Sequence, residues 1–285
     1  MAIYKQYTQV ALDRQYNNRL QVPEFATHLE RWELLSRQTE KKYPVTKNVA
    51  YSDLPREVLD IYPSSQPRSK ILVFIHGGYW QRFDKSSFHF VAGAFQSYNI
   101  TTVLLNYPLA PVVSMDQIIS SCKKAVHWLL SNIFLFNGNA DEIYVAGHSA
   151  GAHLAAMLMA SDWQHDNHNS GADVFKGACM ISGLFNLIPV QLSEVNQGLH
   201  MDAETALRNS PVRFKPEIQC PILLGVGDEE TEEFKDQSKE LYTCWKDNIA
   251  IQFFQIPGLN HFSILEALCD PTSLLHINMR KLMKL

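Results

Sequence analysis

The residues best suited to do chemistry surround a serine in the motif GHSAG at positions 147–151. Residues 141–146 before it have the β-branched and aromatic content of a short buried strand, and residues 150–160 have a helix-forming composition. A strand that turns sharply into a helix at G-x-S-x-G is typical of a nucleophile elbow, which exposes the serine hydroxyl at the helix N-terminus. We therefore expect Ser149 to be a nucleophile; the alternative is a tight turn whose serine is incidental.

Such a serine needs a general base, and in this kind of sheet the acid and then the histidine follow it along the chain. His261 lies in loop 257–262 after the last expected strand, from which it can reach across the carboxyl edge of the sheet. His148 flanks the nucleophile but is expected to point elsewhere, and His153 enters the following helix. We expect His261 to be the base, against the alternative of a solvated loop histidine.

The acid is expected in the loop after the strand at residues 221–226, where Asp228, Glu229 and Glu230 follow one another. Hydrolases that have such a nucleophile elbow commonly place the acid three positions after the glycine that closes the strand, here Gly227. That spacing favours Glu230. Asp228 stays open as the alternative, and the carboxylate that is not used belongs to a charged surface loop.

The motif HGGY at residues 76–79 follows a continuous apolar run and could stabilise an oxyanion. Acyl transfer places negative charge on the carbonyl oxygen, which aimed backbone N–H groups stabilise. We expect the N–H groups of Gly78, Tyr79 and Ala150 to form this hole, and His76 to orient the loop by hydrogen bonding.

Apolar runs alternate with helix-period segments along most of the chain, which predicts a mostly parallel sheet with helices on both faces, an α/β fold. Residues 58–62 alternate as a half-exposed strand would. Further strands are expected at residues 71–75, 101–105, 141–146, 177–181, 221–226 and 249–256. Helices are expected at residues 114–134, 150–160, 232–245, 262–268 and 273–282.

The 285 residues are expected to form a single domain, with two additions. Residues 1–48 form an N-terminal arm, helical near 10–20 and 23–39, whose aromatic residues provide an apolar face that can pack on the domain. Residues 183–210 form a lid-like insertion between two strands.

Composition limits the partners. The net charge is −4 with scattered lysines and arginines, so neither nucleic acid nor a membrane is an expected partner, and a small-molecule substrate is. No apolar stretch resembles a signal peptide or a membrane span, and the five cysteines include no C-x-x-C pair, so a cytoplasmic protein is expected. A homodimer is compatible with this composition.

Cofactor motifs are weak or missing. The sequence contains no G-x-x-x-x-G-K-[ST] and no G-x-G-x-x-G, so nucleotide binding has no support. His165, Asp166 and His168 could suggest a metal site, but their segment is polar and offers no further ligand, so a solvated loop is preferred. We expect neither a metal nor an organic cofactor.

The motifs GHSAGAHLAA, HGGYW, NYPLAP and NHF together resemble the α/β-hydrolase fold in its branch related to hormone-sensitive lipase, and more narrowly the kynurenine formamidase (arylformamidase) family. The aromatic arm and a G-x5-E-F pattern at residues 227–234 extend the resemblance over most of the chain. The resemblance implies hydrolysis of N-formyl-L-kynurenine to L-kynurenine and formate in tryptophan catabolism. One departure is that the family usually has aspartate where Glu230 stands.

Because the formyl group is the smallest acyl group, specificity is expected to come from the leaving-group pocket. Tyr79 and Trp80 are expected to bind substrate, and Phe185 of the insertion could add to an aromatic wall; ordinary core packing is the alternative. Two other functions stay open: a broad carboxylesterase with the same machinery, and a non-catalytic binding protein that keeps the fold.

Overall fold

The computed structural model describes residues 1–163 and 174–285. Within them, eight strands form one sheet in the order β1-β2-β4-β3-β5-β6-β7-β8. The first two pairings, β1 with β2 and β2 with β4, are antiparallel, and all later ones are parallel. The mostly parallel sheet is thereby confirmed. The strands are β1 (Thr46–Ala50), β2 (Val58–Tyr62), β3 (Ser69–Ile75), β4 (Thr101–Leu105), β5 (Gly138–His148), β6 (Gly177–Ile181), β7 (Ile222–Gly227) and β8 (Ile251–Ile256).

The central strands are apolar without interruption because both of their faces are buried. In β3, Ile71 and Val73 join one hydrophobic core, whereas Leu72 and Phe74 join a second core on the opposite face. Side chains alternate between the faces of a strand, so each central strand contributes to both cores.

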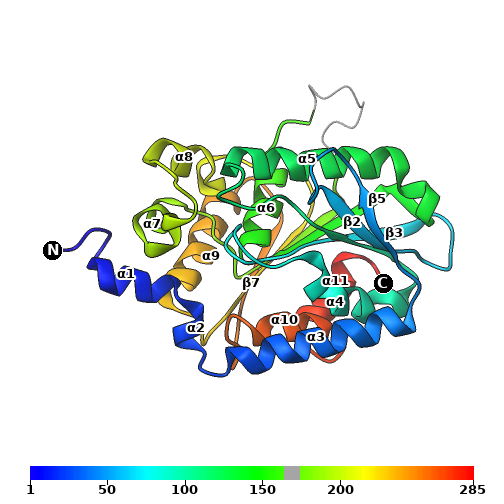
Figure 1. The fold of residues 1–285 in the computed structure, drawn as a ribbon, viewed down its shortest axis with the longest axis horizontal. Coiled ribbons are helices and arrows are strands. Elements are labelled where there is room, and N and C mark those ends of the chain that lie inside the picture. Colours follow the sequence, from blue (N-terminus) through cyan, green and yellow to red (C-terminus); the bar gives the residue numbers. More distant parts are fainter. Residues whose placement is uncertain (164–173) are drawn as a thin grey trace.

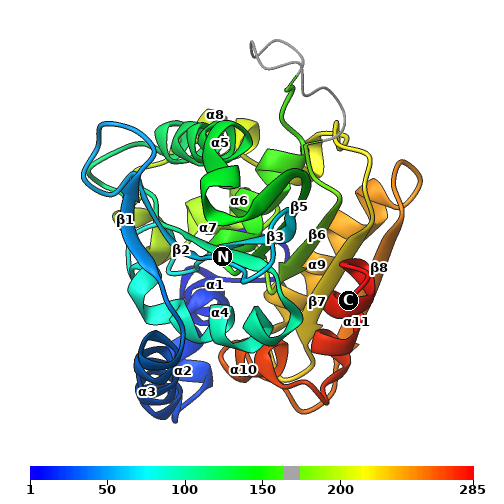
Figure 2. The same ribbon diagram turned by 90° about the vertical axis from the view of Figure 1, so that its right-hand side faces the viewer.

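Helices cover the two faces, as Figures 1 and 2 show. One core contains side chains of α5, α6 and α9, and the other contains side chains of α3, α4, α10 and α11. The helices are α1 (Gln9–Tyr16), α2 (Asn18–Gln21), α3 (Phe25–Lys42), α4 (His89–Phe95), α5 (Met115–Asn132), α6 (Ala150–Met159), α7 (Ile188–Leu192), α8 (Ala203–Arg208), α9 (Glu232–Trp245), α10 (Ser263–Cys269) and α11 (Leu274–Leu282).

The N-terminal arm is three helices instead of the two expected. Asn17 divides the first piece, because its side-chain oxygen accepts a hydrogen bond from the N–H of Leu20 and caps α2. The third helix, α3, lies along the same face of the molecule as α4 and α10 (Figure 1). This third helix is therefore an integral layer over that face, whereas α1 packs on the other side, where Leu12 and Tyr16 join the core that contains α9.

The expectation for residues 58–62 was wrong in one respect. Strand β2 is covered at its edge by β1, a strand that polar residues hid from the sequence pattern, and so β2 is buried almost throughout. Asp60, the charged residue of this strand, is only 1% exposed.

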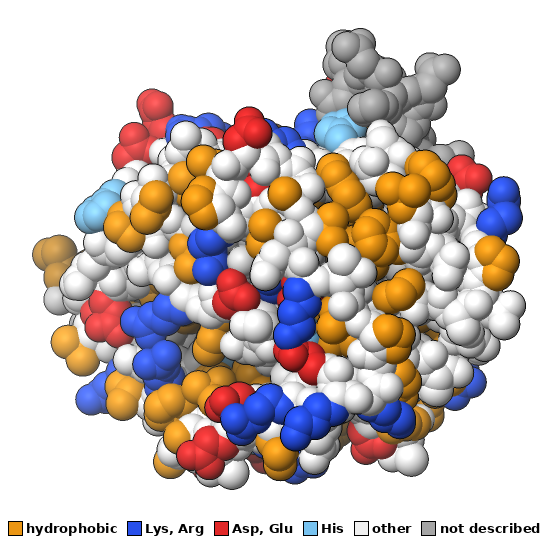
Figure 3. All heavy atoms as spheres, turned by 45° about the vertical axis from the view of Figure 1, so that its right-hand side comes forward, with side chains coloured by type: hydrophobic (Ala, Val, Ile, Leu, Met, Phe, Trp, Pro, Cys, Tyr) orange, Lys and Arg blue, Asp and Glu red, His pale blue; other side chains and the backbone are white. Residues whose placement is uncertain are grey.

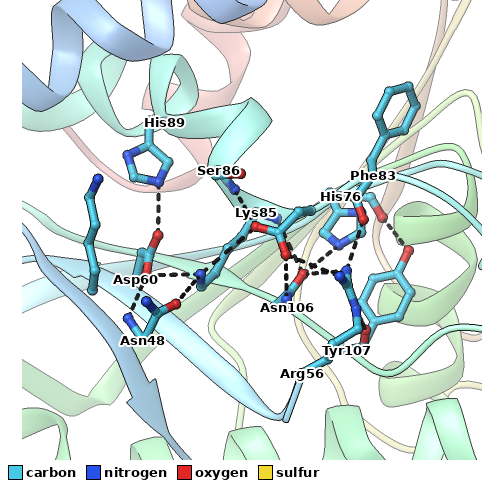
Figure 4. Close-up of polar contacts among 12 residues, drawn as sticks. Asn48, Arg56, Asp60, His76, Phe83, Lys85, Ser86, His89, Asn106 and Tyr107 are labelled. Atoms are coloured by element: carbon cyan, nitrogen blue, oxygen red, sulfur yellow. Dashed lines mark hydrogen bonds and ion pairs between the residues drawn. The ribbon is translucent and has the colours of Figure 1, made fainter.

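Asp60 is buried because it has charged partners (Figure 4). Its carboxylate lies 3.1 Å from Nζ of Lys85 and 2.8 Å from Nε2 of His89, and it accepts the N–H of Asn48 at 2.7 Å. Burial alone raises the pKa of Asp60, but these hydrogen bonds outweigh it and hold the pKa below its usual value. Through His89, which also lies 3.0 Å from a carboxylate oxygen of Glu40, the cluster links β2 to α3 of the arm.

Removing Asp60 should therefore destabilise the fold. An Asp60→Leu variant leaves the Lys85 ammonium buried and without its main counter-charge, which we expect to cost about 3 to 5 kcal/mol in urea unfolding. Adding Lys85→Met should recover part of that loss; strictly additive effects would contradict direct coupling. Because the folded pKa of Asp60 is lowered, its contribution is present above the unfolded value of about 3.9 and is lost as pH falls through the folded pKa.

The surface is of mixed charge. On the face shown in Figure 3, basic and acidic side chains are intermixed. Among the described residues, none of the helices is both long and apolar enough to cross a membrane, and no cluster of His, Cys, Asp or Glu could hold a metal ion. The candidate metal ligands His165, Asp166 and His168 lie outside the described residues.

Candidate active site

A cavity of about 620 Å³ opens at the carboxyl edge of the sheet, a size that suits a small-molecule ligand. Its walls come from five parts of the chain: the arm from Tyr16 to Trp32, the loop after β3, the turn between β5 and α6, the lid-like insertion, and the loop after β8. Ser149 and His261 both line it. Ligands of open α/β sheets bind at this edge, so the cavity is the candidate active site.

Ser149 stands at the sharp turn between β5 and α6. Its backbone has φ 56° and ψ −119°, a strained conformation for a residue with a side chain, and its N–H donates to the carbonyl of Ile181 at 2.8 Å. Glycine is required beside it. A Cβ on Gly151 would lie 1.9 Å from the carbonyl oxygen of Ile75, and one on Gly147 would lie 2.2 Å from that of Gly151. The two glycines of the motif thus let β3, β5 and α6 approach closely enough to hold the turn.

Glu230 lies against His261. The Nδ1–H of His261 donates to Oε2 of Glu230 at 2.6 Å, and both side chains are buried. The other oxygen of the carboxylate, Oε1, accepts the Ser182 hydroxyl at 2.5 Å and the N–H of Gly227 at 2.8 Å. These donors fix the carboxylate in a single orientation.

Asp228, the alternative acid, is directed elsewhere. Its Oδ1 accepts the N–H of Gly258 at 2.6 Å, which closes the turn at the start of loop 257–262, the histidine loop. The structure therefore brings Glu230, and not Asp228, to the imidazole. Ser182, at the end of β6, is a residue of this site that the sequence did not reveal, because a lone serine after a strand has no distinguishing pattern.

His148 supports the histidine loop from the opposite side. Its Nε2–H donates to the backbone carbonyl of His261 at 2.9 Å, and the two rings lie 4.7 Å apart between centroids. Burial, and then the neighbouring His261, lower the pKa of His148 well below its usual value, so its imidazole stays neutral. His148 lines the cavity, contrary to the expectation that it points elsewhere.

The Oγ of Ser149 and the Nε2 of His261 are not hydrogen-bonded to each other or to any other described residue. Neither atom is fully buried, because a fully buried atom without a partner would be one of the buried unsatisfied polar atoms, and neither is. In an active site without substrate, catalytic hydrogen bonds are often long and tighten only when the complex forms. Both atoms are thus available to a ligand in the cavity.

The loop after β3 presents free N–H groups beside the serine. A Cβ on Gly77 would lie 3.1 Å from Cβ of Ser149, so the loop and the nucleophile are in close contact. The N–H groups of Gly78, Tyr79 and Ala150 donate to no acceptor among the described residues. Gly78 has φ 113°, and a Cβ there would lie 2.4 Å from the carbonyl oxygen of Arg82, so only glycine fits this position.

Buried side chains hold this loop in place (Figure 4). The Nδ1–H of His76 donates to the carbonyl of Gly77 at 2.7 Å. Arg56 donates to Oδ1 of Asn106 at 2.9 Å and to the carbonyl of Phe83 at 2.8 Å. Burial lowers the pKa of His76 to about 4, so this histidine is neutral and anchors the loop instead of transferring protons.

Of the aromatic residues expected to bind substrate, only one lines the cavity. Tyr79 does, and its hydroxyl donates to the carbonyl of Tyr16 at 2.6 Å, which joins the loop to the arm. Trp80 is 0% exposed, packs edge-on against His153 in the core, and does not line the cavity; the expectation for it was wrong. Phe185 is also buried in the core, as the alternative of ordinary core packing predicts.

The reason for the difference at Trp80 is the path of the backbone. Tyr79 and Trp80 both have positive φ, 53° and 57°, so the loop turns tightly and the two successive rings leave it in different directions. The aromatic wall comes instead from residues of the arm and the histidine loop, such as Trp32 and Phe262. An amphipathic helix gives no sign, in sequence alone, that its apolar face closes an active site.

Several known proteins are similar to this chain in sequence or in fold. The BD-FAE family model matches residues 59–244. Kynurenine formamidase of Danio rerio is 34% identical over 83% of this chain and 82% of its own length, and that of Salmo salar is 32% identical over 78% and 76%. The crystal structure of a candidate thioesterase from Silicibacter superposes with a TM-score of 0.83 at 28% identity, over 93% of this chain and 97% of that one.

The family model covers the loop after β3 and the serine turn, both of which line the cavity, and ends before the loop that carries His261. The sequence relationship is close enough, over enough of both chains, to assign the family and not only the fold. The protein is a hydrolase of the α/β-hydrolase fold and belongs to the kynurenine formamidase family.

Proposed function

We propose that this protein hydrolyses N-formyl-L-kynurenine to L-kynurenine and formate, with Ser149, His261 and Glu230 as the catalytic triad. The observation that carries the proposal is the hydrogen bond between His261 and Glu230 in the cavity that Ser149 lines. The relatives from Danio rerio and Salmo salar are kynurenine formamidases, which supports the choice of substrate.

In the first half of the reaction, Oγ of Ser149 attacks the formyl carbon while Nε2 of His261 takes the hydroxyl proton. The carbonyl oxygen becomes an oxyanion, which accepts hydrogen bonds from the free N–H groups of Gly78, Tyr79 and Ala150. The C–N bond then breaks, and Nε2–H of His261 protonates the departing aryl amine nitrogen. L-kynurenine leaves, and the formyl group remains as an ester on Ser149.

In the second half, His261 removes a proton from water, the hydroxide attacks the formyl ester, and formate leaves as Ser149 regains its proton. Glu230 acts throughout by accepting Nδ1–H, which keeps Nε2 as the proton acceptor and stabilises the imidazolium. An aryl amine suits this scheme because its nitrogen lone pair is delocalised into the ring, so it leaves more readily than an alkylamine.

The test is the hydrolysis of N-formyl-L-kynurenine beside p-nitrophenyl acetate by the purified protein. Faster release of kynurenine, measured as kcat/KM, would support the formamidase function. Comparable or faster turnover of the simple ester, with little kynurenine formed, would replace it with a broad carboxylesterase. If neither substrate reacts, the chain is a non-catalytic member of the fold.

A further inference from the structure

Two arginines without an acidic partner stand at the cavity. Arg19 on α2 and Arg82 in the loop after β3 both line it, from opposite ends of the N-terminal third of the chain. Neither guanidinium has an ion pair with a carboxylate among the described residues; that of Arg19 lies over the ring of Phe25, 5.3 Å from its centroid.

The two charges are close enough to act on each other. Burial, and then the charge of Arg82, lower the pKa of Arg19 from its usual value. Two guanidiniums that repel each other beside a cavity favour an anion placed between them, because it would neutralise both. Guanidinium groups also match the planar carboxylate geometry better than ammonium groups do.

Arg82 is held at a fixed place relative to the oxyanion loop. Its N–H donates to the carbonyl of Gly78 at 3.0 Å, in the turn where only glycine fits. The next residue, Phe83, is fixed in turn by the hydrogen bond from Arg56 (Figure 4). The backbone from which the Arg82 side chain extends thus has a fixed position relative to the N–H groups beside Ser149.

A buried amide provides a second, independent sign of a ligand. Asn18 lines the cavity and is 7% exposed, yet its side chain has no hydrogen-bond partner among the described residues. Its polar atoms are not among those sealed from solvent. A buried amide without a protein partner is costly unless a ligand or water satisfies it, so the interior beside Arg19 is suited to a polar group.

We propose that Arg19 and Arg82 bind the α-carboxylate of an amino-acid leaving group, with Asn18 as a further hydrogen-bond donor from the cavity wall. The proposal rests on the proposed function, since it assigns the residues that hold the amino-acid end of the substrate while the formamide lies at Ser149. It also makes the arm a determinant of specificity, because two of the three residues lie on α2.

The experiment compares a carboxylated substrate with a neutral one. Wild type, Arg82→Gln, Arg19→Gln and the control Arg37→Gln are assayed on N-formyl-L-kynurenine and on 2′-formamidoacetophenone, which has the same aryl formamide without the amino-acid end. Arg37 lies on α3, where it pairs with Glu33 outside the cavity, so this control removes the same charge elsewhere.

For each cavity arginine we expect kcat/KM on N-formyl-L-kynurenine to fall about 10- to 100-fold, mainly through KM, because a charge-assisted hydrogen bond to the substrate is lost. Turnover of the neutral formamide should be unchanged, and Arg82→Lys should keep part of the preference. Equal losses on both substrates, or no loss on either, would overturn the carboxylate site.

Binding separates this proposal from the proposed function. Calorimetric titration of L-kynurenine and of 2′-aminoacetophenone into the Ser149→Ala protein measures the site without turnover. If wild type hydrolyses neither formamide but L-kynurenine binds and loses affinity in the arginine variants, the carboxylate site stands and the function falls. If wild type is an active formamidase but the arginine variants keep the preference for the carboxylated substrate, the function stands and the site falls.

Discussion

A Ser149→Ala variant should hydrolyse N-formyl-L-kynurenine about 10⁴-fold more slowly than wild type, or slower still, with the fold intact. In the proposed mechanism the hydroxyl forms the covalent intermediate, so its loss removes the formyl-enzyme route and leaves only what the oxyanion N–H groups and binding can provide. The backbone at this position has φ 56°, which alanine tolerates no worse than serine does.

The measurement is single-turnover and steady-state release of kynurenine, together with the circular dichroism and the urea midpoint of the variant. Loss of activity at an unchanged midpoint would establish the chemical role of the hydroxyl. A variant that retains more than about one per cent of kcat would rule out Ser149 as the nucleophile, since that residual rate far exceeds what remains when a triad member is removed.

The second large effect is expected at Glu230. A Glu230→Gln variant should lose about 10⁴-fold in kcat, because a neutral amide no longer holds His261 with its proton on Nδ1 and no longer stabilises the imidazolium. The Ser182 and Gly227 donors should still fix the side-chain oxygen, so the loss should come from electrostatics and not from a collapsed loop.

Asp228→Asn is the matched control, two residues away in the same loop. Its carboxylate holds the N–H of Gly258, a hydrogen bond that the amide oxygen of asparagine can keep, so kcat should stay within about threefold of wild type. If the asparagine variant were the inactive one and the glutamine variant active, the acid would be Asp228 and the histidine loop would have to rearrange during the reaction.

These two residues show how far the sequence could determine the site. Counting from Gly227 favoured Glu230, and the structure places its carboxylate 2.6 Å from His261. The count could not decide the matter alone, because both carboxylates lie in one turn and only the direction of each side chain separates them. That direction depends on Ser182 and Gly258, which come from other strands and loops.

The sheet was easier to predict than its edge. Buried parallel strands such as β3 and β7 are apolar on both faces, which leaves a continuous signal in the sequence. Strand β1 has the sequence TKNVA and lies exposed at the edge, so neither alternation nor an apolar run revealed it. The burial of β2 was missed for the related reason that the partners of Asp60, Lys85 and His89, are distant in sequence.

The cavity walls were the least predictable part. Tyr79 and Trp80 are neighbours in a recognisable motif, yet one lines the cavity and the other is core, because backbone dihedrals decide where each ring goes. The contribution of Trp32 and Arg19 depends on how the arm docks, which is a tertiary event without a local pattern.

The docking of the arm also determines when, during synthesis, the cavity closes and the protein becomes able to hydrolyse a substrate. The arm leaves the ribosome well before its partners do. Tyr16 bonds to Glu233, 217 positions on, Lys5 bonds to the same glutamate at a separation of 228, and His28 bonds to Glu266 at a separation of 238. Contacts this distant in sequence close late. A nascent chain therefore carries its serine turn without a closed cavity around it, and hydrolytic capacity arises only after residues 233–266 have emerged.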